Sequence, residues 1–474
     1  MKRGLFLFLL LVFTRQLNAA PITVVAKANE VNALLQFLLG CERNGESYSQ
    51  FKYVFGDTAS AKTKEMLKEW ANISHHNMLK FEGFPDSRHN GKSSFNLVFI
   101  QSVNARTIYE LIQNCTGFYT QNDLKKFSDV LYYFYPIYHK RVWLPNGKRI
   151  AADVQKLNVY IKSKGIDSYF SKAANFYGVE WQSEIPFYVL IHPMLGKVDY
   201  TMARPMGNVL IADYVLGDKN YSGWLGVVFH EMCHVLYSNQ TREKQYAAEH
   251  YFLNSSNPKY SLAAYNWFDE TVATAIGNGY LVEKLNGKVD ENEWYANEYI
   301  HKNARAVFPL VKNHLDSAKT MNGQFFSDYI DLIEKAFPNV NRELENLFSF
   351  IDIAADTVNN EVYRNFYTYF HPRWINLESP VDHTTLEKTN RQLHTKIILL
   401  TKKPAEQLQE VNELLQTSFS DASAFPDKIF YECRADGKNY LVFYLSSINK
   451  FDAALKKLFE LKLLPEEKGM MIVD

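Results

Sequence analysis

One stretch of this chain combines a strongly apolar helical pattern with ionisable side chains. Residues 221–237 are rich in Leu, Val and Phe, and among them stand His230, Glu231 and His234. Two histidines four residues apart project from one face of a helix, so both imidazoles can reach a single metal ion. Without a partner, these groups would be costly to bury. The spacing therefore predicts a metal-binding helix, and a satisfied pair of core histidines is the alternative.

Glu231 directly follows the first histidine of this pattern. A carboxylate in this position can take a proton from a water molecule that the metal activates. Catalytic zinc usually has three protein ligands and keeps one position open for water. The pattern thus predicts a hydrolytic site with one zinc ion per chain, with Glu231 as general base and with His230 and His234 as two of the ligands.

The best candidate for the third ligand is Glu270. It lies in the next long helix, which is expected over residues 261–285. An adjacent antiparallel helix can aim its carboxylate at the metal. The polar stretch 238–259 reads as an inserted loop and leaves rival ligands, namely Glu243, Glu249 and His250. Residues 235–241 contain neither Gly nor His, which excludes the metzincin arrangement.

The five residues His230-Glu231-Met232-Cys233-His234 form a His-Glu-x-x-His pentad. Together with Trp267-x-x-Glu270-x-x-Ala273, this pentad resembles the gluzincin metallopeptidases, which include the gluzincin aminopeptidases and the thermolysin-like enzymes. The resemblance covers about residues 186–285. It implies that His230, His234 and Glu270 bind zinc and that Glu231 is the general base. It also implies a small sheet before the helix, with residues 208–214 as the edge strand along which a peptide substrate aligns.

The chain departs from those families in ways that bear on specificity. The segment between His234 and Glu270 is longer than theirs. Gluzincin aminopeptidases place a Glu on the edge strand to hold the substrate's free amine, and the matching residues 204–208 contain no acid. We therefore expect an endopeptidase rather than an aminopeptidase. The residue that stabilises the oxyanion stays open among five tyrosines of suitable type: Tyr295, Tyr299, Tyr329, Tyr363 and Tyr367.

Two other functions remain open. One is a non-catalytic binding protein on a metallopeptidase-like scaffold, and the other is a zinc hydrolase that acts on a non-peptide amide. The intact Glu231 argues against the first, because a degenerate site need not keep its base.

The N-terminus has the layout of a secretory signal peptide. Lys2 and Arg3 precede ten apolar residues, 4–13, and a short tail that ends in small residues. Ten apolar residues are too few to span a bilayer. We expect residues 1–19 to be removed and the protein to be periplasmic or secreted, without a membrane span. Basic and acidic residues balance at 52 each, so no basic excess favours nucleic acid.

The pattern along the chain predicts an α+β protein that is mainly helical. Residues 20–180 read as helices interrupted by one strand, Ser94–Ile100. Residues 181–380 read as a gluzincin-like catalytic domain that begins with three short antiparallel strands, 187–191, 199–203 and 208–214, and continues with helices. Residues 386–474 follow the order β-α-β-β-α-β, which predicts a ferredoxin-like unit.

Two smaller features are ambiguous in the sequence. Cys41 and Cys115 are the likeliest disulfide pair in an exported chain, and four buried thiols are the alternative. His75 and His76 are adjacent, so their side chains diverge and a metal site there is not expected.

Overall fold

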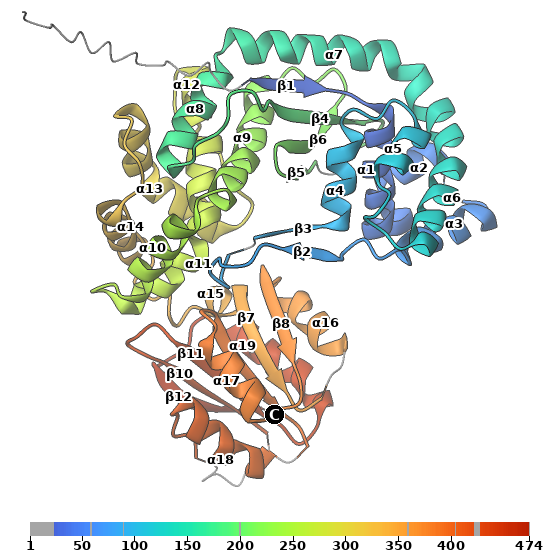
Figure 1. Ribbon diagram of the computed structural model, residues 1–474. Helices are drawn as coiled ribbons and strands as arrows, with labels where there is room; N and C mark the ends of the chain where they lie inside the picture. Colours follow the sequence, from blue (N-terminus) through green and yellow to red (C-terminus); the bar gives the residue numbers. More distant parts are fainter. Residues whose placement is uncertain are drawn as a thin grey trace, which may run out of the picture.

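The computed structural model describes residues 23–56, 59–88, 90–198, 201–357, 360–402, 404–420 and 427–473. Within them the fold is α+β and mainly helical, which confirms the expected class. The expected signal peptide, residues 1–19, lies outside the described residues. Figure 1 shows a large upper body and, below it, a C-terminal domain built on its own sheet.

The upper body contains a four-stranded sheet in the order β1-β4-β6-β5. Its strands are β1 (Val24–Lys27), β4 (Phe187–Met194), β6 (Val209–Val215) and β5 (Ala203–Pro205). β1, β4 and β6 run parallel, and only β5 is antiparallel to its neighbour. The expected antiparallel arrangement is therefore wrong for β4 and β6.

The prediction that residues 208–214 form the edge strand is also wrong. The chain turns back at Gly207, where φ is 91°, so β5 folds onto the outer side of β6. β6 is thereby enclosed between β4 and β5, and β5 becomes the edge. Of the strand expected at 199–203, only Ala203 belongs to β5, and residues 199 and 200 lie outside the described residues.

The N-terminal region is helical, as predicted, with one exception. The expected strand Ser94–Ile100 is wrong, because this segment forms helix α4 (Ser94–Ser102). Ser93 caps the helix by accepting a hydrogen bond from the Asn96 N–H, and the Asn96 side chain accepts one from the Ser93 N–H. The other helices are α1 (Glu30–Asn44), α2 (Ser49–Phe55), α3 (Ala61–Ala71), α5 (Ile108–Asn114), α6 (Gln121–Tyr138), α7 (Leu144–Ser163) and α8 (Ile166–Tyr177).

The expected N-terminal region and catalytic domain share one hydrophobic core, which runs from Val24 to Val340. β1, which the sequence did not indicate, joins the sheet beside β4. α7 runs along the β1 edge in Figure 1, while α1 packs on β4. A short hairpin of β2 (Met78–Lys80) and β3 (Gly91–Ser93) reaches from the N-terminal helices toward the helices that follow the sheet.

Helices follow the sheet and carry the candidate site. The expected long helix 261–285 is α11 (Pro258–Thr274), a π-helical segment (Ala275–Leu281) and α12 (Val282–Asn286). The expected inserted loop is wrong, because residues 242–253 form α10 (Arg242–Leu253), which Thr241 caps. The remaining helices are α9 (Tyr221–Ser238), α13 (Glu298–Asp316), α14 (Gly323–Ala336) and α15 (Leu344–Ser349).

The C-terminal domain has a six-stranded sheet in the order β12-β10-β11-β9-β7-β8. The strands are β7 (Phe350–Ala355), β8 (Trp374–Glu378), β9 (Thr395–Leu400), β10 (Lys428–Cys433), β11 (Asn439–Tyr444) and β12 (Lys468–Ile472). Its helices are α16 (Asn360–Tyr369), α17 (His383–Arg391), α18 (Pro404–Leu415) and α19 (Phe451–Leu461).

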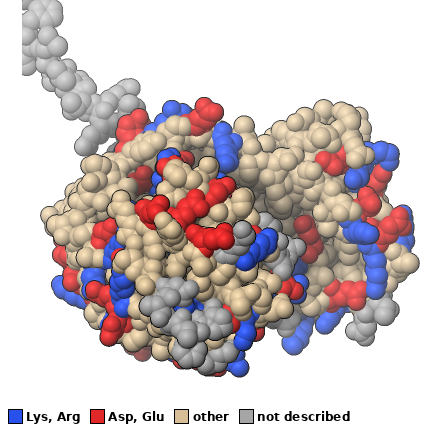
Figure 2. All heavy atoms as spheres, turned by 90° about the horizontal axis from the view of Figure 1, so that it is seen from below, with Lys and Arg blue, Asp and Glu red and all other residues tan. Residues whose placement is uncertain are grey.

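This sheet contains the predicted β-α-β-β-α-β order, but not as a separate ferredoxin-like unit. β7 and β8 extend the sheet beyond β9, so it begins at Phe350 rather than after residue 386. β9 pairs with β11 in parallel, as in a ferredoxin-like unit, but β12 pairs with β10 at the far edge instead of lying beside β9. The expected ferredoxin-like strand arrangement is therefore wrong. Figure 2 looks onto the molecule from below and shows acidic and basic side chains interspersed over that face.

The four cysteines and His75 are buried residues. All four cysteines are free and buried, so the buried-thiol alternative is the one found. His75 is buried, with its ring nitrogens beside Tyr119 Oη and the Trp70 carbonyl oxygen, while His76 is exposed. Among the described residues, no helix is both long and apolar enough to cross a membrane.

Candidate metal centre

Helix α9 presents the pentad from within the core of the upper body. Its first turn is capped by Asn220, whose side-chain oxygen accepts a hydrogen bond from the Gly223 N–H at 3.1 Å. The π-helical segment after α11 packs tightly against α9 at Gly277. A side chain there would bring its Cβ to 2.5 Å from the His230 backbone nitrogen. Glycine therefore allows the close approach that sets the spacing of the two helices at the site.

The two histidines of the pentad converge as predicted. Their Nε2 atoms lie 2.9 Å apart, and the ring planes meet at 82°. Glu231 belongs to the same cluster, in which the potential ligand atoms of His230, Glu231 and His234 all lie within 4.8 Å of one another.

Glu270 on α11 is the candidate third ligand that reaches the histidine pair. Its Oε2 atom lies 3.4 Å from His230 Nε2 and 3.8 Å from His234 Nε2. The rivals are placed differently. Glu243 and His250 are exposed on α10, and Glu249 accepts a hydrogen bond from the Ser87 hydroxyl.

These donor atoms fit a zinc ion. Zn–N and Zn–O bonds of about 2.0–2.2 Å in a tetrahedral site place neighbouring ligand atoms roughly 3.4 Å apart. The two distances from Glu270 Oε2, 3.4 and 3.8 Å, lie close to this value, while the 2.9 Å between the two Nε2 atoms is shorter. Oε2 is also buried and has no hydrogen-bond partner in the described part of the chain. A buried carboxylate oxygen that faces two imidazole nitrogens is suited to a cation.

Helix α11 also supplies the outer partners of both histidines. Asp269 Oδ1 lies 3.0 Å from His234 Nδ1, and Thr274 Oγ1 lies 3.3 Å from His230 Nδ1. Such partners at Nδ1 orient an imidazole and leave Nε2 to face the metal. Sequence reasoning missed both residues, although Asp269 precedes Glu270 and Thr274 follows it by one helical turn.

The charges of the site favour a bound cation. Burial alone lowers the pKa of His234, but Asp269 and two further carboxylates outweigh it and raise the pKa to about 10. Burial alone raises the pKa of Glu270, yet contact with His230, His234 and Arg373 holds it well below its usual range. The cluster therefore keeps Glu270 ionised and holds a positive charge beside it.

Glu231 lies in a different electrostatic setting. Burial raises the pKa of its carboxyl group, and the nearby histidines offset only part of this effect. A carboxylate whose pKa moves toward neutrality is better suited to accept and then return a proton.

Tyr295 is the tyrosine of the five candidates that reaches the site. Its ring centroid lies 5.7 Å from that of His230. Tyr299 instead stacks on Trp267 at 5.5 Å, and Tyr329 is buried. Tyr363 and Tyr367 belong to α16 of the C-terminal domain. The sequence held no signal that singled out Tyr295.

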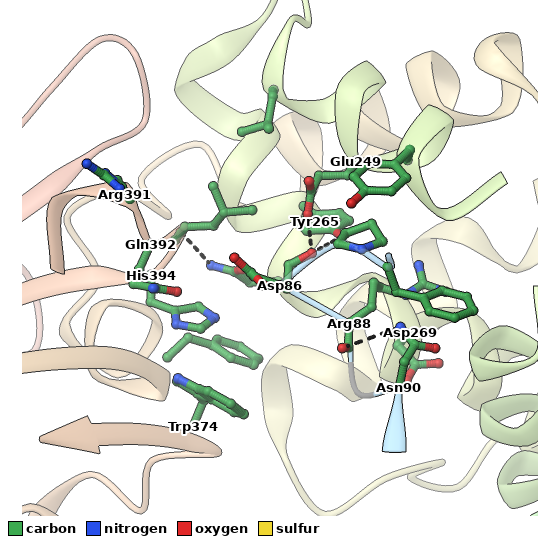
Figure 3. Close-up of a pocket in the computed structure, with 18 of the residues that line it drawn as sticks. Asp86, Arg88, Asn90, Glu249, Tyr265, Asp269, Trp374, Arg391, Gln392 and His394 are labelled. Carbon is green, nitrogen blue, oxygen red and sulfur yellow. Dashed lines mark hydrogen bonds between the residues drawn. The ribbon is translucent and has the colours of Figure 1, made fainter. Parts of the chain in front are cut away.

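A cavity of about 810 Å³ adjoins the site, and three parts of the chain line it. Asp269 and Glu270 belong to its wall, and the loop between β2 and β3 contributes Ser87 and Arg88. The opposite wall comes from the C-terminal domain. In Figure 3, Trp374, Arg391, Gln392 and His394 face Glu249, Tyr265 and Asp86 across this space.

Comparison with family models, with curated proteins and with solved structures finds no match for this chain. The likeness to gluzincins therefore rests on the motif residues alone. What the protein does is inferred from the geometry of the site.

Proposed function

We propose that the protein is a zinc-dependent hydrolase of peptide bonds. One observation carries the proposal, namely the convergence of a buried, unpartnered Glu270 Oε2 with the Nε2 atoms of His230 and His234. Glu231 stands in the same cluster. Two imidazoles and one carboxylate are a common ligand set of catalytic zinc, which keeps one position open for water.

Each residue of the site has a distinct part in this proposal. Zinc in such a site supplies Lewis-acid polarisation of the scissile carbonyl and acidifies water. Glu231 accepts the proton of the attacking water and returns it to the leaving amine. Asp269 and Thr274 orient the two imidazoles. We assign to Tyr295, whose ring lies beside that of His230, the donation of its hydroxyl proton toward the developing oxyanion.

The edge of the upper sheet supports endopeptidase rather than aminopeptidase activity. β5, the outer strand, contacts α9 and is the strand along which we expect an extended peptide to align. β5 carries Arg204, and neither it nor the turn to residue 208 has an acidic side chain. A free substrate amine would find no carboxylate there.

We further propose that the protein is exported and acts in the periplasm or outside the cell. The basic start and the short apolar run of residues 1–19 support this.

The decisive experiment combines metal analysis with cleavage profiling on a peptide library. Wild type should bind about one zinc per chain and cleave peptides internally. Glu231→Gln should keep the zinc, because no ligand is altered, and should lose about a hundred- to ten-thousand-fold in turnover. Glu243→Gln, an exposed change of the same chemistry on α10, is the matched control and should behave as wild type.

The outcomes separate the alternatives. Near-wild-type turnover in Glu231→Gln would show that Glu231 is not the base. A zinc-loaded wild type that cleaves no peptide would favour a non-peptide amide substrate or a binding protein. A wild type without zinc would remove the basis of the proposal.

A further inference from the structure

A residue of the C-terminal domain touches the proposed metal centre. Arg373 immediately precedes β8, and its backbone N–H donates to the Ser349 carbonyl at 2.8 Å. The β7–β8 ladder begins at the next residue of each strand, where Phe350 pairs with Trp374. The backbone of Arg373 is thus fixed at the end of the sheet that faces the upper body.

The guanidinium of Arg373 contacts two residues of the site. Nη2 forms an ion pair with Glu270 Oε1, and Nη1 donates to Tyr295 Oη at 3.5 Å. The two oxygens of Glu270 are thereby divided, since Oε1 faces Arg373 and Oε2 faces the histidines. The side chain of Glu270 is 19% exposed and that of Arg373 is 27% exposed.

The same face of α11 that carries Glu270 is held by the C-terminal domain at other points. The ring of Trp267 meets Phe350 of β7 edge-on at 5.0 Å, and its indole N–H donates at 2.7 Å to Asn346 Oδ1 on α15, the helix that leads directly into β7. Asn266 donates to the Leu393 carbonyl oxygen at 3.4 Å. Arg373 therefore reaches Glu270 across an interface with several defined contacts.

We propose that Arg373 is a positioning residue of the metal centre. It holds Glu270 so that Oε2 points at the histidine nitrogens, and it contacts the hydroxyl of Tyr295, whose ring lies beside that of His230. The C-terminal domain thus completes the site that the upper body carries. This inference rests on the proposed metal centre but not on the choice of a peptide as substrate.

The physical reason lies in the freedom of a carboxylate. Without a partner at Oε1, the Glu270 side chain can rotate or bind through both oxygens, and the ligand geometry loosens. Hydrogen-bond partners of metal ligands typically contribute about 10–100-fold to metal affinity or activity. A planar guanidinium contacts Glu270 and Tyr295 together, which the single ammonium of lysine cannot reproduce.

The test measures zinc affinity by competition with a chelator, together with steady-state kinetics. Arg373→Ala should bind zinc about 10–100-fold more weakly. Arg373→Lys should recover only part of this loss, because it restores the charge without the planar fork. Arg391→Ala is the matched control, since Arg391 lines the same cavity from the same domain, is mostly exposed and pairs with Glu387. It should bind zinc as wild type does.

Zinc affinity keeps this inference separate from the proposed activity. Weaker zinc binding in folded Arg373 variants supports it even if wild type cleaves no peptide. Unchanged or tighter zinc binding in Arg373→Ala would overturn it, because the ion pair would then only compete with the metal for Glu270. If Arg373→Ala fails to fold by circular dichroism, Arg373→Lys decides, and wild-type affinity in that variant overturns the inference. A wild type that takes up no zinc would overturn both proposals.

Discussion

Ionisable side chains are buried at the proposed metal centre and also in the sheet of the C-terminal domain, but their surroundings differ. At the metal centre, His230, His234 and Glu270 face one another, and their outer atoms meet Thr274, Asp269 and Arg373. On β9, Lys396 is fully buried, and its Nζ has no hydrogen-bond partner among the described residues. The ring of Tyr440 lies 6.0 Å from that nitrogen.

The difference shows two ways in which a protein interior accommodates an ionisable group. Burial lowers the pKa of Lys396 to about 7, so its amine is protonated only in part at neutral pH. At the proposed metal centre, opposite charges lie close together, so Glu270 keeps its negative charge. A shifted pKa therefore does not mark a functional site by itself. Donor atoms that converge on one point, with an unpartnered oxygen among them, are the more specific sign.

The largest effect is expected when one of the proposed metal ligands is removed. Glu270→Ala should weaken zinc binding by more than about 100-fold, because it deletes a ligand rather than an outer partner. Glu249→Ala and Glu243→Ala should retain the metal, since neither side chain faces the histidines. Chelator competition measures all three. If Glu249→Ala strips the zinc and Glu270→Ala leaves it, the ligand assignment is wrong.

The lysine offers the complementary test. Lys396→Met should raise the free energy of unfolding at pH 7 by about 2–4 kcal/mol, because it removes a group whose protonated form the folded state disfavours. The folded pKa of about 7 lies below the usual 10.5, so the unfolded chain binds more protons between these values. The free energy of unfolding of the wild type should therefore rise with pH across this window. The difference in stability between Lys396→Met and wild type should shrink accordingly.

Urea unfolding of wild type and Lys396→Met at pH 7 and at pH 10 measures this effect. A variant that is less stable than wild type at both pH values would show that the amine has a partner in the folded protein. The contrast between the two regions would then fail.

The smallest expected effect concerns an outer partner of a histidine. Asp269→Asn keeps the size of the side chain but removes the negative charge beside His234 Nδ1. Zinc affinity should fall by about 10–100-fold, which is less than the loss in Glu270→Ala. The same chelator competition ranks the two variants. Equal losses in both would mean that Asp269 acts as a ligand, and no loss would mean that it does not orient His234.

Features that depend on neighbours along the chain were predictable from the sequence. Apolar spacing located most helices, and the four-residue spacing of His230 and His234 placed both on one face. Glu270 was identified by its motif, and the structure brings it to the pair. α4 was misread, because its aromatic and branched residues resemble a strand and the capping box of Ser93 and Asn96 decides otherwise.

Features that depend on tertiary contacts were not predictable. The turn at Gly207 places β5 outside β6, so no local pattern identifies the edge strand. Tyr295 lies in the segment that precedes α13, and Arg373 belongs to the C-terminal domain. Both reach the site although they are far along the chain from His230. Their residue types are common, and only the fold distinguishes them from others of the same type.

The pairing of β1 with β4 has a consequence for how the protein is made. Val24 is among the first described residues, yet its partner is Phe187, and their shared core extends to Val340. During synthesis the first half of the chain therefore lacks the strands that complete its sheet, and contacts so distant in sequence form slowly. The late completion of this sheet agrees with the proposed export, because a translocation channel admits a chain that has not yet folded.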